Sequence, residues 1–300
     1  MSEILEENSM DKKGKSRKKE ALYGILFVAP AAVGTLIFFL FPFLISVFYS
    51  FMDGVATRRF VGLQNYMELL GNKTFQMAVG NTVRFVVVAI PFLNLVALTL
   101  AFLLMRMQRT TRDFLRSTYI FPLVLPVASV VLFFEFLFHE TGIVNIALQF
   151  FHMDAIDFVH SKYAFWVLII LYVWKNCGYN VILFVAMLES VPKEYYEEAS
   201  LQGAGSLAKM WYITLPVSVP YLFFILIISF VNSFKAFREA YVLFGNYPDN
   251  SIYMIQHFIN NNFENINYTR ISTSAALVFS VIFLIVLFLF WLQKIWNERN

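Results

Sequence analysis

Four polar side chains recur at helical spacing inside one long apolar stretch of the sequence. Tyr172, Lys175, Asn176 and Tyr179 stand at positions i, i+3, i+4 and i+7, so a helix would place them on one face. Amines and amides can hydrogen-bond to hydroxyl groups, and phenol rings can stack on the apolar face of a pyranose. The pattern predicts a face that binds a sugar. The alternative is that Lys175 and Asn176 only hydrogen-bond to a neighbouring helix.

A second polar group, residues 232–236, closes a later apolar stretch. We expect Asn232 and Ser233 to face the same ligand path. The charged residues beside them suit either ligand contact or a surface role, by snorkelling or as a mutual ion pair: Lys235, Arg238 and Glu239. Structural roles near helix ends or beside a proline are favoured for the other polar residues of the apolar stretches: Arg84, Asn94 and Glu135.

A third group of residues predicts a short helix outside the apolar stretches. Pro192 can open this helix, glutamates follow in its first turns, and Gly203 or Gly205 can end it. Tyr195 or Tyr196 would share a stripe with the small residues Ala199 and Gly203, so a second protein could approach the helix backbone closely. The alternative is a helix that lies at lipid headgroups and is anchored there by its tyrosines.

The sequence carries none of the common signatures of an enzyme or a metal site. It has no Gly-x-x-x-x-Gly-Lys-Ser/Thr loop, no Gly-x-Ser-x-Gly and no His-Glu-x-x-His. His152 and Asp154 have no further close ligands, and Cys177 is the only cysteine. We therefore expect no catalytic residues, no metal and no cofactor.

The elements that hold these residues must lie in a membrane. Hydrophobic residues make up 59% of the 300 residues and charged residues only 14%, which no soluble globular chain matches. The net charge of +3 is too small to indicate nucleic acid. We predict an all-α protein with six membrane-spanning helices, at about residues 21–51, 79–105, 117–138, 164–191, 215–237 and 274–296.

The distribution of Lys and Arg predicts how these helices are oriented. With both termini in the cytoplasm, fourteen basic residues lie inside, among them Lys12, Lys13, Lys15, Arg17, Lys18 and Lys19 of the N-terminal tail, and six lie outside. The expected divisions are a basic tail over 1–20, which contacts anionic lipid, a first span over 21–51, and a core over 75–296. The short helix then lies in a cytoplasmic loop, residues 192–216, between spans four and five.

This loop resembles the "EAA" loop of the permeases of binding-protein-dependent ABC importers. The resemblance rests on Glu197-Glu198-Ala199, Gly203 and the ending Ile213-x-Leu215-Pro216 in the expected loop of a six-span chain. Glu198 and Gln202 depart from the usual motif, in which alanine and aspartate are common. Residues near Asn81-Thr82, Phe121-Pro122 and 233–248 are similar to the maltose-type branch that takes up carbohydrates, and the resemblance covers about residues 20–296.

The resemblance implies a function and a set of partners. The loop helix would couple to a cytosolic ATPase through Glu197, Ala199 and Gly203, and the face on span four would line a sugar path. The implied partners are a second similar permease, two ATPase subunits and an extracytoplasmic binding protein, all at a bacterial inner membrane. A transporter driven by an ion gradient is the rival hypothesis, although it would want a carboxylate in mid-membrane, and Glu135 lies near a span end.

Overall fold

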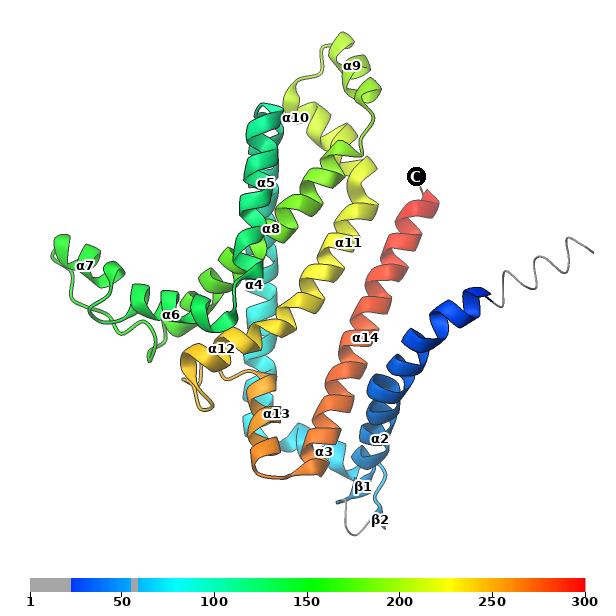
Figure 1. Cartoon of the computed structure of the whole chain (residues 1–300), viewed down its shortest axis with the longest axis vertical. Helices are drawn as coiled ribbons and strands as arrows, with labels where there is room; N and C mark the ends of the chain where they lie inside the picture. The colour runs from blue at the N-terminus through cyan, green and yellow to red at the C-terminus, as the bar shows by residue number, and fades with distance from the viewer. Residues whose placement is uncertain (1–22, 55–58, 300) are drawn as a thin grey trace, which may run out of the picture.

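The computed structural model describes residues 23–54 and 59–299, and this part of the chain is almost entirely helical (Figure 1). The basic residues of the N-terminal tail lie outside the described residues. Six helical segments are long and apolar enough to cross a membrane, which confirms the predicted number: Tyr23–Ser50, Lys73–Met105, Val127–Phe150, Ala164–Glu189, Ser206–Phe244 and Tyr268–Trp296.

The first and last helices form a pair at one side of the molecule (Figure 1). The first contains a π-helical turn, η1 (Leu36–Leu40), and continues as α2 (Phe41–Ser50). The last, α14 (Tyr268–Arg299), packs against α2, where the ring centroids of Phe43 and Phe279 are 4.4 Å apart. Most of their other large apolar side chains are exposed on the surface of the chain, as expected for helices that face lipid or another membrane subunit.

The core lies between α4 (Lys73–Met105) and α8 (Ala164–Glu189). Asn72 caps α4, because its side chain accepts a hydrogen bond from the amide of Phe75 at 2.9 Å. One stripe of α4 at spacing i, i+4 is buried completely or nearly so, and three of its five members are alanines: Phe85, Ala89, Leu93, Ala97 and Ala101. Small side chains of this kind let two membrane helices approach closely.

The third predicted span is not one helix. The structure has α5 (Arg109–Val124) and α6 (Val127–Phe138), separated by Leu125 and Pro126, and α6 runs across the direction of α5 (Figure 1). Proline has no amide hydrogen to donate and disfavours helical conformation in the residue before it, and Leu125 is indeed extended (φ −64°, ψ 138°). The predicted range 117–138 was therefore wrong as a single helix. The membrane-length segment here comprises α6 and α7 (Ile143–Phe150).

The glycine at position 178 explains how α5 lies so close to α8. A Cβ atom at Gly178 would stand 1.6 Å from the carbonyl oxygen of Tyr119, so only glycine fits where the two backbones cross. The fifth span is built from consecutive pieces that continue one another: α10 (Ser206–Lys209), η2 (Met210–Thr214), α11 (Leu215–Ser233), η3 (Phe234–Ala236) and α12 (Phe237–Phe244).

Most connecting elements gather at the two ends of the molecule, whereas α7 and its loops project from one side (Figure 1). The helix α9 (Lys193–Leu201) lies at one end, near the start of α5. At the other end lie the hairpin of β1 (Met52–Asp53) and β2 (Arg59–Phe60), α3 (Gln64–Gly71) and α13 (Ile255–Glu264). This division separates the loop that we predicted to be cytoplasmic, residues 192–216, from β1, β2, α3 and α13.

Candidate functional site

The predicted loop helix exists as α9, and its last turn requires Gly203. The amide of Gly203 donates to the carbonyl of Ser200 at 3.0 Å, and the amide of Ala204 donates to the carbonyl of Ala199 at 2.9 Å. These paired bonds close the helix with Gly203 in the left-handed region, at φ +79°. No atom lies within 4 Å of a Cβ built on Gly203, so the backbone angle, and not a neighbouring side chain, selects glycine.

Two side-chain contacts hold α9 against the start of the fifth span. The hydroxyl of Tyr196 lies 2.9 Å from that of Thr214, and the ammonium of Lys209 donates to the hydroxyl of Ser200 at 2.6 Å. Thr214 is the variable residue of the Ile-x-Leu-Pro segment, so the Tyr196 contact joins α9 to that segment. α9 is therefore joined to the start of the fifth span by these contacts as well as through the chain.

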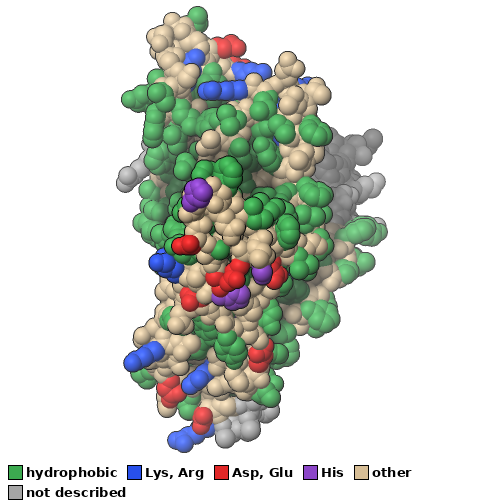
Figure 2. Space-filling model, turned by 90° about the vertical axis from the view of Figure 1, so that its left-hand side faces the viewer, with side chains coloured by type: hydrophobic (Ala, Val, Ile, Leu, Met, Phe, Trp, Pro, Cys, Tyr) green, Lys and Arg blue, Asp and Glu red, His purple; other side chains and the backbone are tan. Residues whose placement is uncertain are grey.

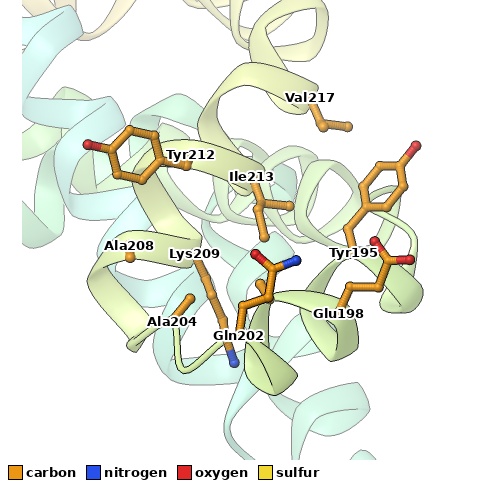
Figure 3. A pocket seen from close by; sticks show the side chains of 10 residues that line it. Tyr195, Glu198, Gln202, Ala204, Ala208, Lys209, Tyr212, Ile213 and Val217 are labelled. Carbon is orange, nitrogen blue, oxygen red and sulfur yellow. The ribbon is translucent and has the colours of Figure 1, made fainter.

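A cleft of about 470 Å³ separates the remaining face of α9 from α10 and η2 (Figure 3). From α9 it is lined by Tyr195, Glu198, Ala199 and Gln202, and Ile213 lies on the opposite wall. Glu197 is exposed and does not line the cleft, while Leu215 and Pro216 begin α11. The residues of the EAA-like loop motif thus lie in three places: at the cleft, on the exposed face of α9 and at the start of α11.

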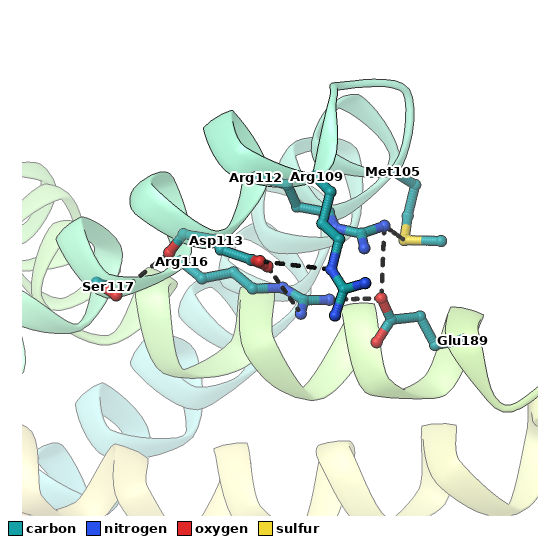
Figure 4. A network of polar contacts seen from close by, with 7 residues as sticks. All are labelled: Met105, Arg109, Arg112, Asp113, Arg116, Ser117 and Glu189. Atoms are coloured by element: carbon teal, nitrogen blue, oxygen red, sulfur yellow. Dashed lines mark hydrogen bonds and ion pairs between the residues drawn. The ribbon is translucent and has the colours of Figure 1, made fainter.

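The end of α8 that leads into α9 is tied to α5 by a network of charges (Figure 4). The guanidinium of Arg116 lies 2.8 Å from the carboxylate of Glu189, and that of Arg112 lies 3.5 Å from the same oxygen. Asp113 lies 3.8 Å from Arg116. The side chain of Glu189 is 39% exposed, so the network contributes geometry more than stability.

A second cavity, of about 330 Å³, lies where α8 meets the end of the fifth span, beside the break between α5 and α6. Three of the four residues predicted on span four line it, and Asn232 joins them from α11: Lys175, Asn176, Tyr179 and Asn232. Residues 57 positions apart and predicted separately thus meet at one cavity. Leu123 and Val127, on either side of the Leu125-Pro126 break, form its apolar wall.

Two of the residues predicted for the ligand path lie in the core of this chain and not at the cavity. Tyr172 is 2% exposed, its hydroxyl donates to the carbonyl of Ser229 at 3.3 Å, and its ring packs on Phe85. Ser233 is 3% exposed and donates to the carbonyl of Phe230 at 2.6 Å. The predicted stripe of four residues is wider than the cavity. Its first residue, Tyr172, therefore lies in the contact of α8 with α4 and α11.

The structure adds Glu239 of α12 to the cavity and pairs it with Lys175. The ammonium and the carboxylate form a buried ion pair, with Lys175 9% and Glu239 6% exposed. The open alternatives for Glu239 are ligand contact, a surface role by snorkelling, or an ion pair with Lys235 or Arg238, its close neighbours in sequence. Its partner instead lies 64 residues away. The one signal in the sequence was that an apolar span containing a lysine needs an anion nearby.

Several other polar residues of the membrane helices have structural contacts. The side chains of Asn94, Asn180 and Ser229 form a hydrogen-bonded cluster that joins α4, α8 and α11, with Asn180 donating to Ser229 at 2.8 Å. The guanidinium of Arg84 lies 4.2 Å from the ring centroid of Phe165. These contacts support the structural interpretation of Arg84 and Asn94.

On the side of the molecule where α6 and α7 project, charged side chains occur at the top, in the middle and toward the bottom, with hydrophobic side chains between them (Figure 2). Charged residues lie at the top end, and hydrophobic side chains dominate the rest of the upper half. Carboxylates and histidines gather near the middle. The loops around α7 contribute residues of these types: His139, Glu140, His152, Asp154, Asp157 and His160. No three of His, Cys, Asp or Glu come together as a metal site within residues 23–54 and 59–299.

The sequence matches the model of a protein family described as the inner membrane component of binding-protein-dependent transport systems, over residues 93–300. The chain belongs to this family. It is therefore a permease, the membrane-spanning subunit of an ABC transport system, and ATP hydrolysis takes place in separate ATPase subunits. Membership rules out the rival transporter driven by an ion gradient.

Several relatives of this permease have names that give a substrate. It is 33% identical over 234 residues to the arabinooligosaccharides transport system permease protein AraP of Bacillus subtilis, covering 76% of this chain and 74% of that one. It is 30% identical over 250 residues to a probable starch degradation products transport system permease protein, AmyD, of Thermoanaerobacterium thermosulfurigenes, covering 82% and 84%. It is 30% identical over 222 residues to the lactose transport system permease protein LacF of Rhizobium radiobacter, covering 73% and 74%.

The fold of this permease also occurs in a solved structure. A chain of a bacterial ABC transporter involved in the import of the acidic polysaccharide alginate superposes with a TM-score of 0.80, at 20% sequence identity, over 93% of this chain and 96% of that one. At this identity the likeness shows the fold. It agrees with the predicted all-α, six-span architecture.

Proposed function

We propose that this permease imports a sugar or oligosaccharide by alternating access, together with a second permease, two ATPase subunits and an extracytoplasmic binding protein. The observation that carries the proposal is the cavity at which Lys175, Asn176 and Tyr179 of α8 meet Asn232 of α11. The names of AraP, AmyD and LacF support a saccharide as the substrate.

The two amides of this cavity have capacity left for ligand hydroxyls. Asn176 donates to the carbonyl of Tyr172 at 2.8 Å, and Asn232 accepts from Lys235 at 2.9 Å. Within the described residues, neither the Oδ1 of Asn176 nor the Nδ2 of Asn232 has a hydrogen-bond partner. Tyr179 supplies a half-buried aromatic face beside them. An acceptor, a donor and a ring are the groups that a pyranose needs.

We also propose that α9 is the element on which the ATPases act, through Glu197, Ala199 and Gly203. Its closed last turn makes it a rigid body, and it is joined to α11 through Thr214 and, by the charge network at Glu189, to α5. Both α5 and α11 reach the cavity, at Leu123 and Asn232. In this proposal α9 and both termini lie in the cytoplasm, and β1, β2, α3 and α13 lie outside.

The test is uptake by the complete transporter, expressed with its partner subunits and reconstituted in proteoliposomes with ATP enclosed. We expect ATP-dependent uptake of a saccharide that the binding protein delivers. Asn176→Ala and Asn232→Ala should each raise the KM for this uptake about tenfold, because each removes a net hydrogen bond of about 1 kcal/mol or slightly more. Asn262→Ala, which removes an amide from α13 outside the cavity, is the matched control.

The proposal fails if no saccharide is taken up under conditions in which the binding protein, the ATPases and this chain are shown to assemble. The proposed position of the sugar path is wrong if Asn262→Ala raises the KM for uptake as much as the two cavity variants do. Membrane content of each variant, measured by immunoblot, separates a transport defect from a loss of protein.

A further inference from the structure

The cavity between α8 and α12 carries more positive than negative charge. Its ten lining residues include the three cations Lys175, Lys235 and Arg238 but the single carboxylate Glu239. A cavity that served only neutral hydroxyl groups would need none of these cations. The presence of three cations at one site between membrane helices therefore needs a physical explanation.

The carboxylate is already used by one of the cations. Glu239 and Lys175 are the buried pair, so together they contribute no net charge to the cavity. Within the described residues, neither Lys235 nor Arg238 forms an ion pair, and both side chains are exposed. Lys235 donates one hydrogen bond, to the Oδ1 of Asn232 at 2.9 Å. Two cations are thus left facing the cavity without a counter-charge.

The apolar and aromatic lining of the cavity is correspondingly small. Leu123, Val127 and Ala236 are its apolar residues, and Tyr179 is its one aromatic ring. Stacking on rings, which would hold a neutral sugar, is therefore limited here. Charge remains as the main source of attraction, and it acts more strongly beside a low-dielectric wall than in open water.

We propose that the transported saccharide is anionic, and that Arg238 and Lys235 hold its acidic group while Asn176, Asn232 and Tyr179 contact its ring. A uronate is the simplest such saccharide, because a planar guanidinium matches a carboxylate in a bidentate geometry. Lys235 adds a second, more mobile donor. Lys175 keeps Glu239 neutralised, so that this carboxylate does not repel the ligand. The inference rests on the proposed function and names the class of its substrate.

The test compares matched acidic and neutral saccharides in the reconstituted transporter. The probes are galacturonate oligomers against galactose oligomers of the same length, and glucose 6-phosphate against glucose, the last pair separating phosphate from carboxylate recognition. We expect uptake of the acidic member of a pair and not of the neutral one. Uptake of galacturonate oligomers identifies a carboxylate, and uptake of the sugar phosphate alone identifies a phosphate.

Variants then assign the selectivity to the two cations. Arg238→Gln and Lys235→Gln should each raise the KM for the acidic saccharide about tenfold or more, the range for a lost charged hydrogen bond. Arg238→Lys should retain part of the affinity. Lys73→Gln removes the same charge from an exposed position at the start of α4, outside the cavity, and should leave uptake unchanged.

The outcomes distinguish this inference from the proposed function. Uptake of neutral saccharides alone, with acidic ones excluded, overturns the inference and leaves the importer intact. Uptake of acidic saccharides that Arg238→Gln and Lys235→Gln do not weaken also overturns it, because the charge would then be recognised elsewhere. If neither member of any pair and no other saccharide is taken up, the proposed function itself fails.

Discussion

At the scale of single residues, the buried pair of Lys175 and Glu239 is the most consequential contact in the membrane helices. Each group alone would be expensive to bury, since desolvation of an ion costs several kcal/mol. Together they join α8 to α12 at the wall of the cavity. The pair therefore shapes the cavity and sets its charge at the same time.

Removing one partner should cost far more than removing both charges. We expect Glu239→Gln to destabilise the permease by about 3–5 kcal/mol, because an unpaired ammonium would remain buried. The double variant Lys175→Met with Glu239→Gln should regain most of this stability. Thermal unfolding of the purified protein in detergent measures both. A double variant no more stable than Glu239→Gln would show that the pair is not coupled.

His257 in α13 predicts how stability depends on pH. Burial lowers its pKa from 6.5 to about 4, and the ring packs between Phe237 and Tyr253. As the pH falls below 6.5, His257 is protonated in the unfolded chain but stays neutral in the folded chain. Stability should therefore fall between about pH 6.5 and 4, by up to about 3 kcal/mol, and this group adds no further loss below pH 4.

The variant His257→Gln should remove this part of the pH dependence. Melting temperatures recorded from pH 7.5 to 4 in detergent give the slope, and His160→Gln, on an exposed side chain, is the control. An unchanged slope in His257→Gln would mean that other groups cause the acid sensitivity.

At the scale of elements, the end of α9 predicts how docking can be separated from folding. Gly203→Asp places a charge on the proposed ATPase surface, in open space, at a left-handed position where aspartate is strained less than most other residues. We expect normal amounts of protein in the membrane but loss of ATP-driven uptake. Gly205→Asp, two residues on, also has open space but an extended backbone (φ −71°, ψ 169°), and should transport normally. Normal uptake by Gly203→Asp would count against α9 as the coupling element.

The break between α5 and α6 is the second feature of this scale. It puts Leu123 and Val127 at the cavity, while the other end of α5 is tied to Glu189, four residues before α9 begins. One helix thus connects the proposed site of ATPase action with the proposed site of transport. An unbroken third span would have carried Val127 and the rest of α6 past the cavity.

At the scale of the whole molecule, the separation of loops to two ends predicts an orientation that can be measured. Ser206→Cys lies near α9, and Asn265→Cys lies after α13 at the opposite end; both positions are exposed. The natural Cys177 is buried, so its own labelling should be weak. We expect a membrane-impermeant maleimide to label Asn265→Cys in intact cells, and Ser206→Cys only after permeabilisation. The reverse pattern would invert the proposed topology.

The sequence by itself determined the class and the number of spans of this permease, and the presence of the loop helix α9. Apolar stretches of membrane length are local features, and a membrane forces such stretches into helices whatever their neighbours. The spacing of Glu197, Ala199 and Gly203 is equally local. The sequence also placed Lys175, Asn176 and Tyr179 on the helix face that meets Asn232.

Only the tertiary structure decided which polar residues line the cavity and with what charge. A helical stripe such as 172–179 is wider than the gap that neighbouring helices leave, so packing against α4 and α11 turned Tyr172 inward. Glu239 meets Lys175 across 64 residues, and no local pattern encodes such a distance. Periodicity fixes which residues share a face, whereas the packing of helices fixes which part of that face remains open.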